Sequence, residues 1–90
     1  MYEWDENKNI SNLKKHGIDF TIAVEVFSDP AALTQLSREQ ANEERYKTIG
    51  KLMNETIILF VVYTKRVEKF RIISARKASK KERQLYENQN

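Results

Sequence analysis

The spacing of apolar residues changes at Asp29-Pro30, and this change constrains the fold more than any other feature. Before it, four apolar residues recur at i, i+3, i+4 and i+7, the spacing of a helix that buries one side, and they are Phe20, Ala23, Val24 and Phe27. After it, apolar and polar residues alternate over several stretches, as in half-exposed strands. The sequence therefore predicts an α+β fold, in which a sheet packs against helices.

Two helices are predicted before the change. The first covers Glu6 to His16, because Asp5 is a good N-cap and Gly17 can adopt the positive φ that often follows a last turn. The second follows Asp19, another N-cap, and ends before Asp29-Pro30, since proline pushes the preceding residue out of the helical region.

Three or four antiparallel strands and a carboxy-terminal helix are predicted after the change. The expected strands cover Ala32 to Leu36, Glu44 to Met53, Thr56 to Thr64 and Glu68 to Arg76. Alternation along the second of them places on one side Arg45, Lys47, Ile49, Lys51 and Met53. The third strand is the most continuously apolar and suits a central strand covered on both faces. Turns or loops are expected at Ser37 to Asn42, Asn54-Glu55 and Lys65 to Glu68. Ser79 and Glu82 have the spacing of a capping box, which opens a helix running toward Glu87.

Length and composition limit the class of protein. The 90 residues fit one small domain, which we place at 1–90. Without cysteine, the chain has no disulfide framework, no thiolate metal site and no Cys nucleophile, so a reducing cytoplasm is its natural compartment. The amino terminus is acidic without an apolar leader, and the longest apolar run, Ile57 to Tyr63, is too short to cross a bilayer. We expect a soluble, cytoplasmic protein that does not enter a membrane.

The net charge of +3 hides an asymmetry between the two halves. Residues 1–45 carry five basic and nine acidic side chains, a net of −4, whereas residues 46–90 carry eleven basic and four acidic ones, a net of +7. Such a division indicates a surface for a polyanion built from the second half. The alternative is a solvated basic surface without a partner.

Several kinds of chemistry are excluded by the residues present. We expect neither a metal nor a cofactor, because His16 is the sole imidazole and no thiolate can complete a ligand set. No G-x-S-x-G elbow accompanies that imidazole, and Gly17 and Gly50 are too far apart for a Gly-rich phosphate loop. Adjacent carboxylates such as Glu43 and Glu44 point apart and do not converge on one substrate atom.

The strongest chemical feature is a basic cluster on the last strand and the first turn of the last helix. Its members are Arg71, Arg76, Lys77, Lys80, Lys81 and Arg83. Guanidinium groups bind phosphate bidentately, and a helix N-terminus adds oriented N–H groups. Strict alternation places Arg71 and Arg76 on opposite faces, so both serve one site only if a bulge or the strand's end redirects Arg76.

Two other sets of residues have alternative roles. His16 lies at the end of the first predicted helix, where it either caps the helix or takes part in catalysis or RNA contact. The aromatic residues either stack on bases or belong to the core and its rim, and they are Trp4, Tyr46, Tyr63 and Tyr86.

Ordered motifs along the chain resemble the BrnT toxin family. They are Trp4-Asp5, Lys8, Lys15-His16-Gly17-Ile18, Phe20, Ala23, Val26-Phe27, Asp29-Pro30, Glu44-Arg45-Tyr46, Ile49-Gly50, the stretch RIISARKAS that begins at Arg71, Glu82-Arg83 and Tyr86. The resemblance extends from Tyr2 to about Glu87.

The resemblance implies a RelE-like fold and the toxin of a type II toxin-antitoxin system, an endoribonuclease that inhibits translation until a BrnA-like antitoxin neutralises it. It also implies a heterotetramer of two toxins and two antitoxins, which contacts operator DNA only through the antitoxin. RelE-like enzymes use no metal, and the ribose 2′-OH attacks the adjacent phosphate to leave a cyclic phosphate. The alternative is a non-catalytic RNA-binding or regulatory module that acts through a partner protein.

The resemblance also suggests roles for individual residues. Arg71 and Arg76 are assigned to the scissile phosphate, and His16, Glu44 or a lysine with a lowered pKa to the general base. The candidate RNA contacts are Lys77, Lys80, Lys81, Arg83, Arg45 and Tyr46.

Overall fold

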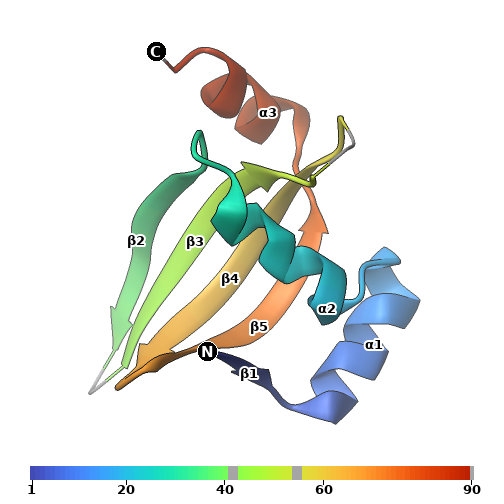
Figure 1. The fold of residues 1–90 in the computed structure, drawn as a ribbon, viewed down its shortest axis with the longest axis vertical. Helices are drawn as coiled ribbons and strands as arrows, with labels where there is room; N and C mark the ends of the chain where they lie inside the picture. Colours follow the sequence, from blue (N-terminus) through green and yellow to red (C-terminus); the bar gives the residue numbers. More distant parts are fainter. Residues whose placement is uncertain (41–42, 54–55, 90) are drawn as a thin grey trace.

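The structure is a computed structural model that describes residues 1–40, 43–53 and 56–89. In chain order its elements are β1 (Tyr2–Trp4), α1 (Glu6–His16), α2 (Phe20–Ala23), a 3-10 helix η1 (Val24–Ser28), β2 (Leu33–Gln40), β3 (Glu43–Lys51), β4 (Ile58–Arg66), β5 (Lys69–Lys77) and α3 (Lys80–Glu87). The amino-terminal helices lie on one face of a sheet, and α3 lies at the end of the sheet where β5 finishes (Figure 1). The α+β prediction is confirmed.

The sheet has five strands in the order β1-β5-β4-β3-β2. β1 runs parallel to β5, and the other neighbouring pairs are antiparallel. The expectation of three or four antiparallel strands is therefore wrong, because the sheet is mixed and includes an amino-terminal strand. Three residues are too few to show alternation, and β1 forms because Tyr2–Trp4 can pair with the exposed edge of β5, far away in sequence.

The predicted caps of the first helix are confirmed. The Asp5 carboxylate accepts the N–H of Asn7 at 2.8 Å, and Gly17 has φ of 73° as it ends α1. The second predicted helix also ends before Pro30, but it forms only one α-helical turn, α2, and continues as η1.

The side of α1 that faces the sheet is polar. Asn9 and Asn12 are buried, whereas the apolar Ile10 and Leu13 are about half exposed. The Asn12 amide donates to the Ala75 carbonyl at 2.8 Å and accepts the Ala75 N–H at 3.1 Å. This amide therefore continues the hydrogen bonding of the β5 edge beyond the end of β1, and it fixes α1 against the sheet.

The strand boundaries shift by a few residues from those predicted. The largest difference is in β2, which continues through Ser37–Gln40, where a polar loop was expected. β2 is an edge strand, and an edge position tolerates a polar sequence within a ladder. Similarly, β4 extends through Lys65 and Arg66, and Val67-Glu68 alone make the turn to β5. Residues 41–42 of the predicted loop and the predicted turn at 54–55 lie outside the described residues.

The core lies between the sheet and α2 with η1. Its fully buried side chains are Phe20, Ala23, Val26, Leu59, Val61, Ile72 and Ala75, with Tyr63 nearly so. Gly50 of β3 permits the close approach of η1, because a Cβ there would come within 2.8 Å of the Val26 Cβ. β4 is central, as predicted, but Phe60 and Val62 on its other face are only half buried. The expectation that both faces are covered is therefore wrong for the second face.

The last helix is held at the end of the sheet by polar contacts. Both hydrogen bonds of the predicted capping box between Ser79 and Glu82 are present. The Tyr86 hydroxyl donates to the Asp29 carboxylate at 2.6 Å, and the Gln89 amide donates to the Ala31 carbonyl. Within the described ranges, no helix is long and apolar enough to cross a membrane.

Candidate functional site

A bulge in β5 places the two candidate catalytic arginines on one face of the sheet. Tyr63 of β4 pairs with Ile72, but the preceding Val62 pairs with Ser74, so Ile73 is an extra residue in β5. Arg76 then lies opposite Phe60, and Arg71 lies opposite Thr64. Because those two β4 residues are four apart in a regular stretch, both arginines point away from the amino-terminal helices. The bulge that the sequence prediction required is present.

We call the sheet surface opposite the amino-terminal helices the open face. The pairing registers place on it Glu3, Leu33, Gln35, Glu43, Arg45, Lys47, Ile49, Lys51, Phe60, Val62, Thr64, Arg71, Ser74 and Arg76. Cations therefore come from β3 and β5, and apolar side chains of β4 lie between them. This arrangement suits a phosphate backbone, whose charges are neutralised by separate cations along its length.

Arg76 is firmly positioned on the open face. Its guanidinium lies 4.1 Å from the centre of the Phe60 ring. Nη1 and Nη2 donate to the two Glu82 carboxylate oxygens at 2.8 and 2.9 Å, and Nη1 also donates to the Lys77 carbonyl at 3.2 Å. The hydrogen bond to Glu82 raises the pKa of Arg76 despite partial burial. The remaining N–H groups, on Nε and Nη2, form a second fork that can bind a phosphate bidentately.

Glu82 connects this arginine to α3. Its Oε1 accepts the backbone N–H of Ser79 at 2.8 Å as well as Nη1 of Arg76. The hydrogen bond from Arg76 lowers the pKa of the Glu82 carboxyl, and the bond from Ser79 lowers it further, while burial acts in the opposite direction. The start of α3 and the position of Arg76 therefore depend on the same carboxylate.

Arg71 and Arg45 are held more loosely. Nη1 of Arg71 lies 3.4 Å from a Glu3 oxygen, and Nε of Arg45 lies 3.4 Å from a Glu43 oxygen. The side chains in both pairs are 30 to 45% exposed. These two arginines flank Thr64 on β4, one on each neighbouring strand. Single, long and solvated contacts of this kind are weak, so both arginines can exchange their partners readily.

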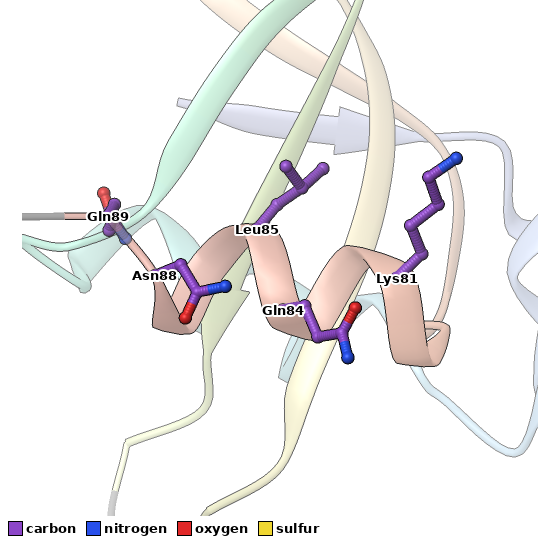
Figure 2. A pocket seen from close by; sticks show the side chains of 5 residues that line it. All are labelled: Lys81, Gln84, Leu85, Asn88 and Gln89. Carbon is purple, nitrogen blue, oxygen red and sulfur yellow. The ribbon is translucent and has the colours of Figure 1, made fainter.

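The other members of the predicted basic cluster are exposed around α3. Lys77 and Arg83 line a surface cavity of about 290 Å³, with Ile58 at its wall. Lys80 is exposed on the first turn of α3. Lys81 lines a second cavity of about 390 Å³ along α3. Figure 2 shows Lys81 and Leu85 extending from the same side of the helix. The predicted cluster is therefore distributed over two surfaces, and Arg76 and Arg71 alone lie on the open face.

Tyr46 and Glu44 lie on the other face of the sheet, away from the arginines. The Tyr46 ring stacks on Tyr63 with centroids 5.9 Å apart, and its hydroxyl donates to Glu44 at 2.8 Å. The Lys65 ammonium lies 4.4 Å from the same ring. The structure thus places Tyr46 at the rim of the core, one of its two predicted positions, and does not bring Glu44 to Arg71 or Arg76.

His16 belongs to the α1 layer. It is half buried in the last turn of α1, one turn beyond Asn12, whose amide contacts the edge of β5. Its imidazole makes no hydrogen bond or ion pair to any part of the chain that the structure describes. His16 thus approaches the sheet from the edge of β5, whereas Arg71 and Arg76 project from the open face.

Sequence reasoning did not identify several residues of the open face. Glu3 and Phe60 were missed, because one belongs to the unpredicted β1 and the other to a run read as core. Lys47 alternates with Arg45 along β3, and that spacing already placed both on one side.

Within the described residues, no group of three or more His, Asp or Glu side chains gathers where it could hold a metal.

Comparison with known proteins gives one informative result. A family model described as the ribonuclease toxin BrnT of type II toxin-antitoxin systems matches residues 4–82. The match includes Arg45, Arg71 and Arg76 of the open face and ends at Glu82, so it covers the three antiparallel pairings of the sheet. A search of curated proteins gives no match.

Proposed function

The chain belongs to the BrnT family of ribonuclease toxins of type II toxin-antitoxin systems, and from this premise we propose that its open face is the RNA-cleaving surface. The observation that carries this proposal is the bulge at Ile73, which brings Arg71 and Arg76 to the same face. The surrounding cations Arg45 and Lys47 suit the neighbouring phosphates of the RNA backbone. This arrangement supports a RelE-like fold and mechanism for residues 1–90, acting as one toxin domain.

In the proposed reaction the ribose 2′-OH attacks the adjacent phosphorus. The new O–P bond closes a 2′,3′-cyclic phosphate, and the bond to the 5′ oxygen breaks. The 2′-OH proton passes to a base, and the leaving 5′ oxygen takes a proton to become a hydroxyl. Arg76 is suited to the charge that builds on the phosphate oxygens, because Glu82 fixes one fork of its guanidinium and leaves the other free. Arg71 holds the RNA backbone at the other end of the face.

For the general base, His16, Glu44 and a lysine are the candidates. Lys47 is the lysine with the most suitable position, because it lies on the open face with its ammonium 6.0 Å from the Phe60 ring centre. The variants His16→Ala, Glu44→Gln and Lys47→Met separate the three. As the base loses its proton, the cleavage rate should rise with pH. We expect the variant that lacks the base to lose this rise, and the other two variants to keep it.

We further propose that Lys77, Lys80, Lys81 and Arg83 contact flanking RNA phosphates around α3. All four side chains are basic, exposed and close to the start of α3. Arg45 and Tyr46 are the remaining proposed RNA contacts, with Arg45 on the open face and Tyr46 across the sheet. The expected compartment is the cytoplasm, where such an enzyme meets its RNA.

An antitoxin partner follows from the family, and we propose that it is BrnA-like and binds where α3 meets the open face. Leu85 of α3 is 53% exposed and lines a small gap with Leu33, Lys47 and Ile49 of the sheet. It also lines the larger cavity with Lys81 (Figure 2). Apolar side chains between lysines suit an antitoxin segment that offers acidic and apolar side chains.

A matched pair of variants tests this docking surface. Leu85→Asp places a charge in the proposed interface, whereas Leu36→Asp alters a leucine of equal exposure (52%) on the other face of the sheet. We expect the first to lose co-purification with the antitoxin and the second to keep it. Equal retention by both variants would contradict the assignment.

We propose a complex of two toxins with two antitoxins, with operator DNA contacted through the antitoxin. Measuring the mass of the complex tests that stoichiometry.

The activity itself is tested with purified toxin and total RNA in excess EDTA, with and without the antitoxin. We expect fragments with cyclic phosphate ends that disappear when the antitoxin is added. Arg71→Ala and Arg76→Ala should abolish the fragments and relieve growth arrest while leaving the fold intact. Intact RNA in this assay would require the same experiment on translating ribosomes. Failure there as well, with RNA binding retained, would indicate the non-catalytic binding module instead.

A further inference from the structure

Among the described residues, one buried side-chain polar atom lacks a hydrogen-bond partner, and it is the Thr64 hydroxyl. The residue is 2% exposed, so water does not satisfy the hydroxyl from the surface. An unpaired buried hydroxyl destabilises a folded protein, and such groups call for a specific explanation. The position of Thr64 between the loosely held arginines supplies one.

Thr64 lies at the centre of a cross-strand row on the open face. Arg45 of β3 pairs with it on one side and Arg71 of β5 on the other. Since neighbouring strands are about 4.8 Å apart, the two arginine backbones are separated by roughly 10 Å with Thr64 midway. Thr64 also lines a surface cavity of about 260 Å³ with Glu43 and Arg66. The hydroxyl therefore lies beneath a place where guanidinium groups from two strands can meet.

We propose that Arg45, Thr64 and Arg71 form a subsite for one phosphate of the RNA backbone, in which the Thr64 hydroxyl donates to a phosphate oxygen. This inference rests on the proposed function, because it names residues that hold RNA at the same face. The phosphate replaces Glu43 and Glu3 as the partner of the two arginines. The Thr64 hydroxyl then gains the acceptor that the free protein lacks.

The charges on the row agree with this exchange. Each arginine has a single contact of 3.4 Å to a carboxylate, Arg45 to Glu43 two residues before it on β3, and Arg71 to Glu3 of β1. A phosphodiester between the two arginines can contact both, whereas each carboxylate contacts one.

Thr48 provides a matched control for the hydroxyl. It is also buried within the sheet, at 1% exposure, but its hydroxyl is within 2.8 Å of the Thr34 hydroxyl and 2.9 Å of the Tyr63 hydroxyl. It faces the amino-terminal helices, on the side opposite Thr64. Replacing each threonine by valine removes a hydroxyl of the same size, which is satisfied in one case and unsatisfied in the other.

The experiment measures two quantities on the whole chain for Thr64→Val, Thr64→Ser, Thr48→Val and Arg71→Ala. The first is the affinity for an oligonucleotide with 2′-O-methyl groups, which cannot undergo 2′-OH attack. The second is the unfolding midpoint in denaturant. We expect Thr64→Val to bind roughly tenfold more weakly while unfolding at the same or a higher denaturant concentration. Thr64→Ser should bind as the wild type does, and Thr48→Val should unfold earlier but bind normally.

Each other outcome has a definite meaning. Wild-type affinity in Thr64→Val, together with weakened binding in Arg71→Ala, overturns the subsite and leaves the proposed function standing. Early unfolding of Thr64→Val to the same extent as Thr48→Val overturns the premise that the hydroxyl is unsatisfied. A wild-type chain that binds no oligonucleotide, or an Arg71→Ala variant that binds it as tightly as the wild type does, overturns the proposed function itself.

Discussion

The two ends of the open face hold their arginines in different ways. At the α3 end, Arg76 makes two hydrogen bonds to Glu82 at 2.8 and 2.9 Å and stacks on Phe60. At the hairpin end, Arg45 and Arg71 each have one contact of 3.4 Å to an exposed carboxylate. A guanidinium that is fixed before the substrate arrives loses little freedom on binding and can act on the transition state. A loosely held one is better suited to grasping the RNA and releasing the product.

The largest effect is expected from exchanging each arginine for lysine, which keeps the charge but removes the forked donors. We expect Arg76→Lys to lower kcat by about 10²-fold or more, with little change in KM. Arg71→Lys should instead raise KM by about tenfold and leave kcat nearly unchanged. Steady-state kinetics on a short RNA measure both. Equal effects of the two variants on kcat would show that the ends do not differ in role.

A second comparison concerns stability at the two ends. We expect Glu82→Gln to lower the free energy of unfolding by about 1 kcal/mol, a value already reduced for the exposure of Arg76, whose side chain is 38% exposed. Glu3→Gln should change it by only a few tenths of a kcal/mol. Denaturant unfolding measures both.

Ser79→Ala is the control for Glu82. It removes the capping hydrogen bond to the Glu82 N–H without removing the ion pair to Arg76. It should therefore destabilise α3 but leave the kinetic role of Arg76 intact. If Glu3→Gln lowered the free energy of unfolding as much as Glu82→Gln does, the proposed difference between the two ends would be contradicted.

The pH dependence of stability should also come mainly from the α3 end. Burial and the hydrogen bond to Asp29 raise the pKa of Tyr86 from 10.0 to about 12. Because the folded pKa lies above the unfolded one, this contribution is complete below pH 10 and is lost as the pH rises through about 12. Solvent screening keeps the loss below about 1 kcal/mol. Between pH 9 and 12, the free energy of unfolding should fall more steeply for the wild type than for Tyr86→Phe. The same pH dependence in both proteins would argue against this role of Tyr86.

The smallest expected effect is on the salt dependence of RNA binding. Arg45→Ala removes one phosphate contact, so the slope of log affinity against log salt should decrease by about 0.7 for a single strand. Glu43→Gln should leave the slope unchanged and raise affinity slightly, because it releases Arg45 from its carboxylate. Binding titrations at several salt concentrations measure these slopes. An unchanged slope in Arg45→Ala would remove that arginine from the interface.

Local features of the fold could be predicted because their causes are local. The cap at Asp5, the positive φ of Gly17 and the capping box at Ser79 depend on residues within one helical turn. The alternation of β3 likewise predicted that Arg45 and Lys47 share a side. In each case a few neighbouring residues contain the whole physical reason for the structure.

The remaining features depend on distant partners. β1 exists because Tyr2–Trp4 find an edge that is 68 residues away, and nothing in three residues shows this. The bulge at Ile73 depends on the pairing of β4 with β5, while the local pattern predicts regular alternation. Glu82 was identified as a cap, but its second role as the partner of Arg76 requires knowing that α3 returns over the end of the strand. The arginines could therefore be named from the sequence, although their shared face depended on an undetectable extra residue.

The Asn12 amide has a further consequence for how the chain behaves at high concentration. A bare strand edge is a template on which another chain can add a strand, by domain swapping or fibre growth. At β5 that template is occupied, by β1 over three residues and then by the helix-borne amide on Ala75. The edge of β2, over Leu33–Gln40, has no such cover from the described elements of the sheet. Any strand-by-strand self-association should therefore begin at β2, because the opposite edge strand, β1, has only three residues.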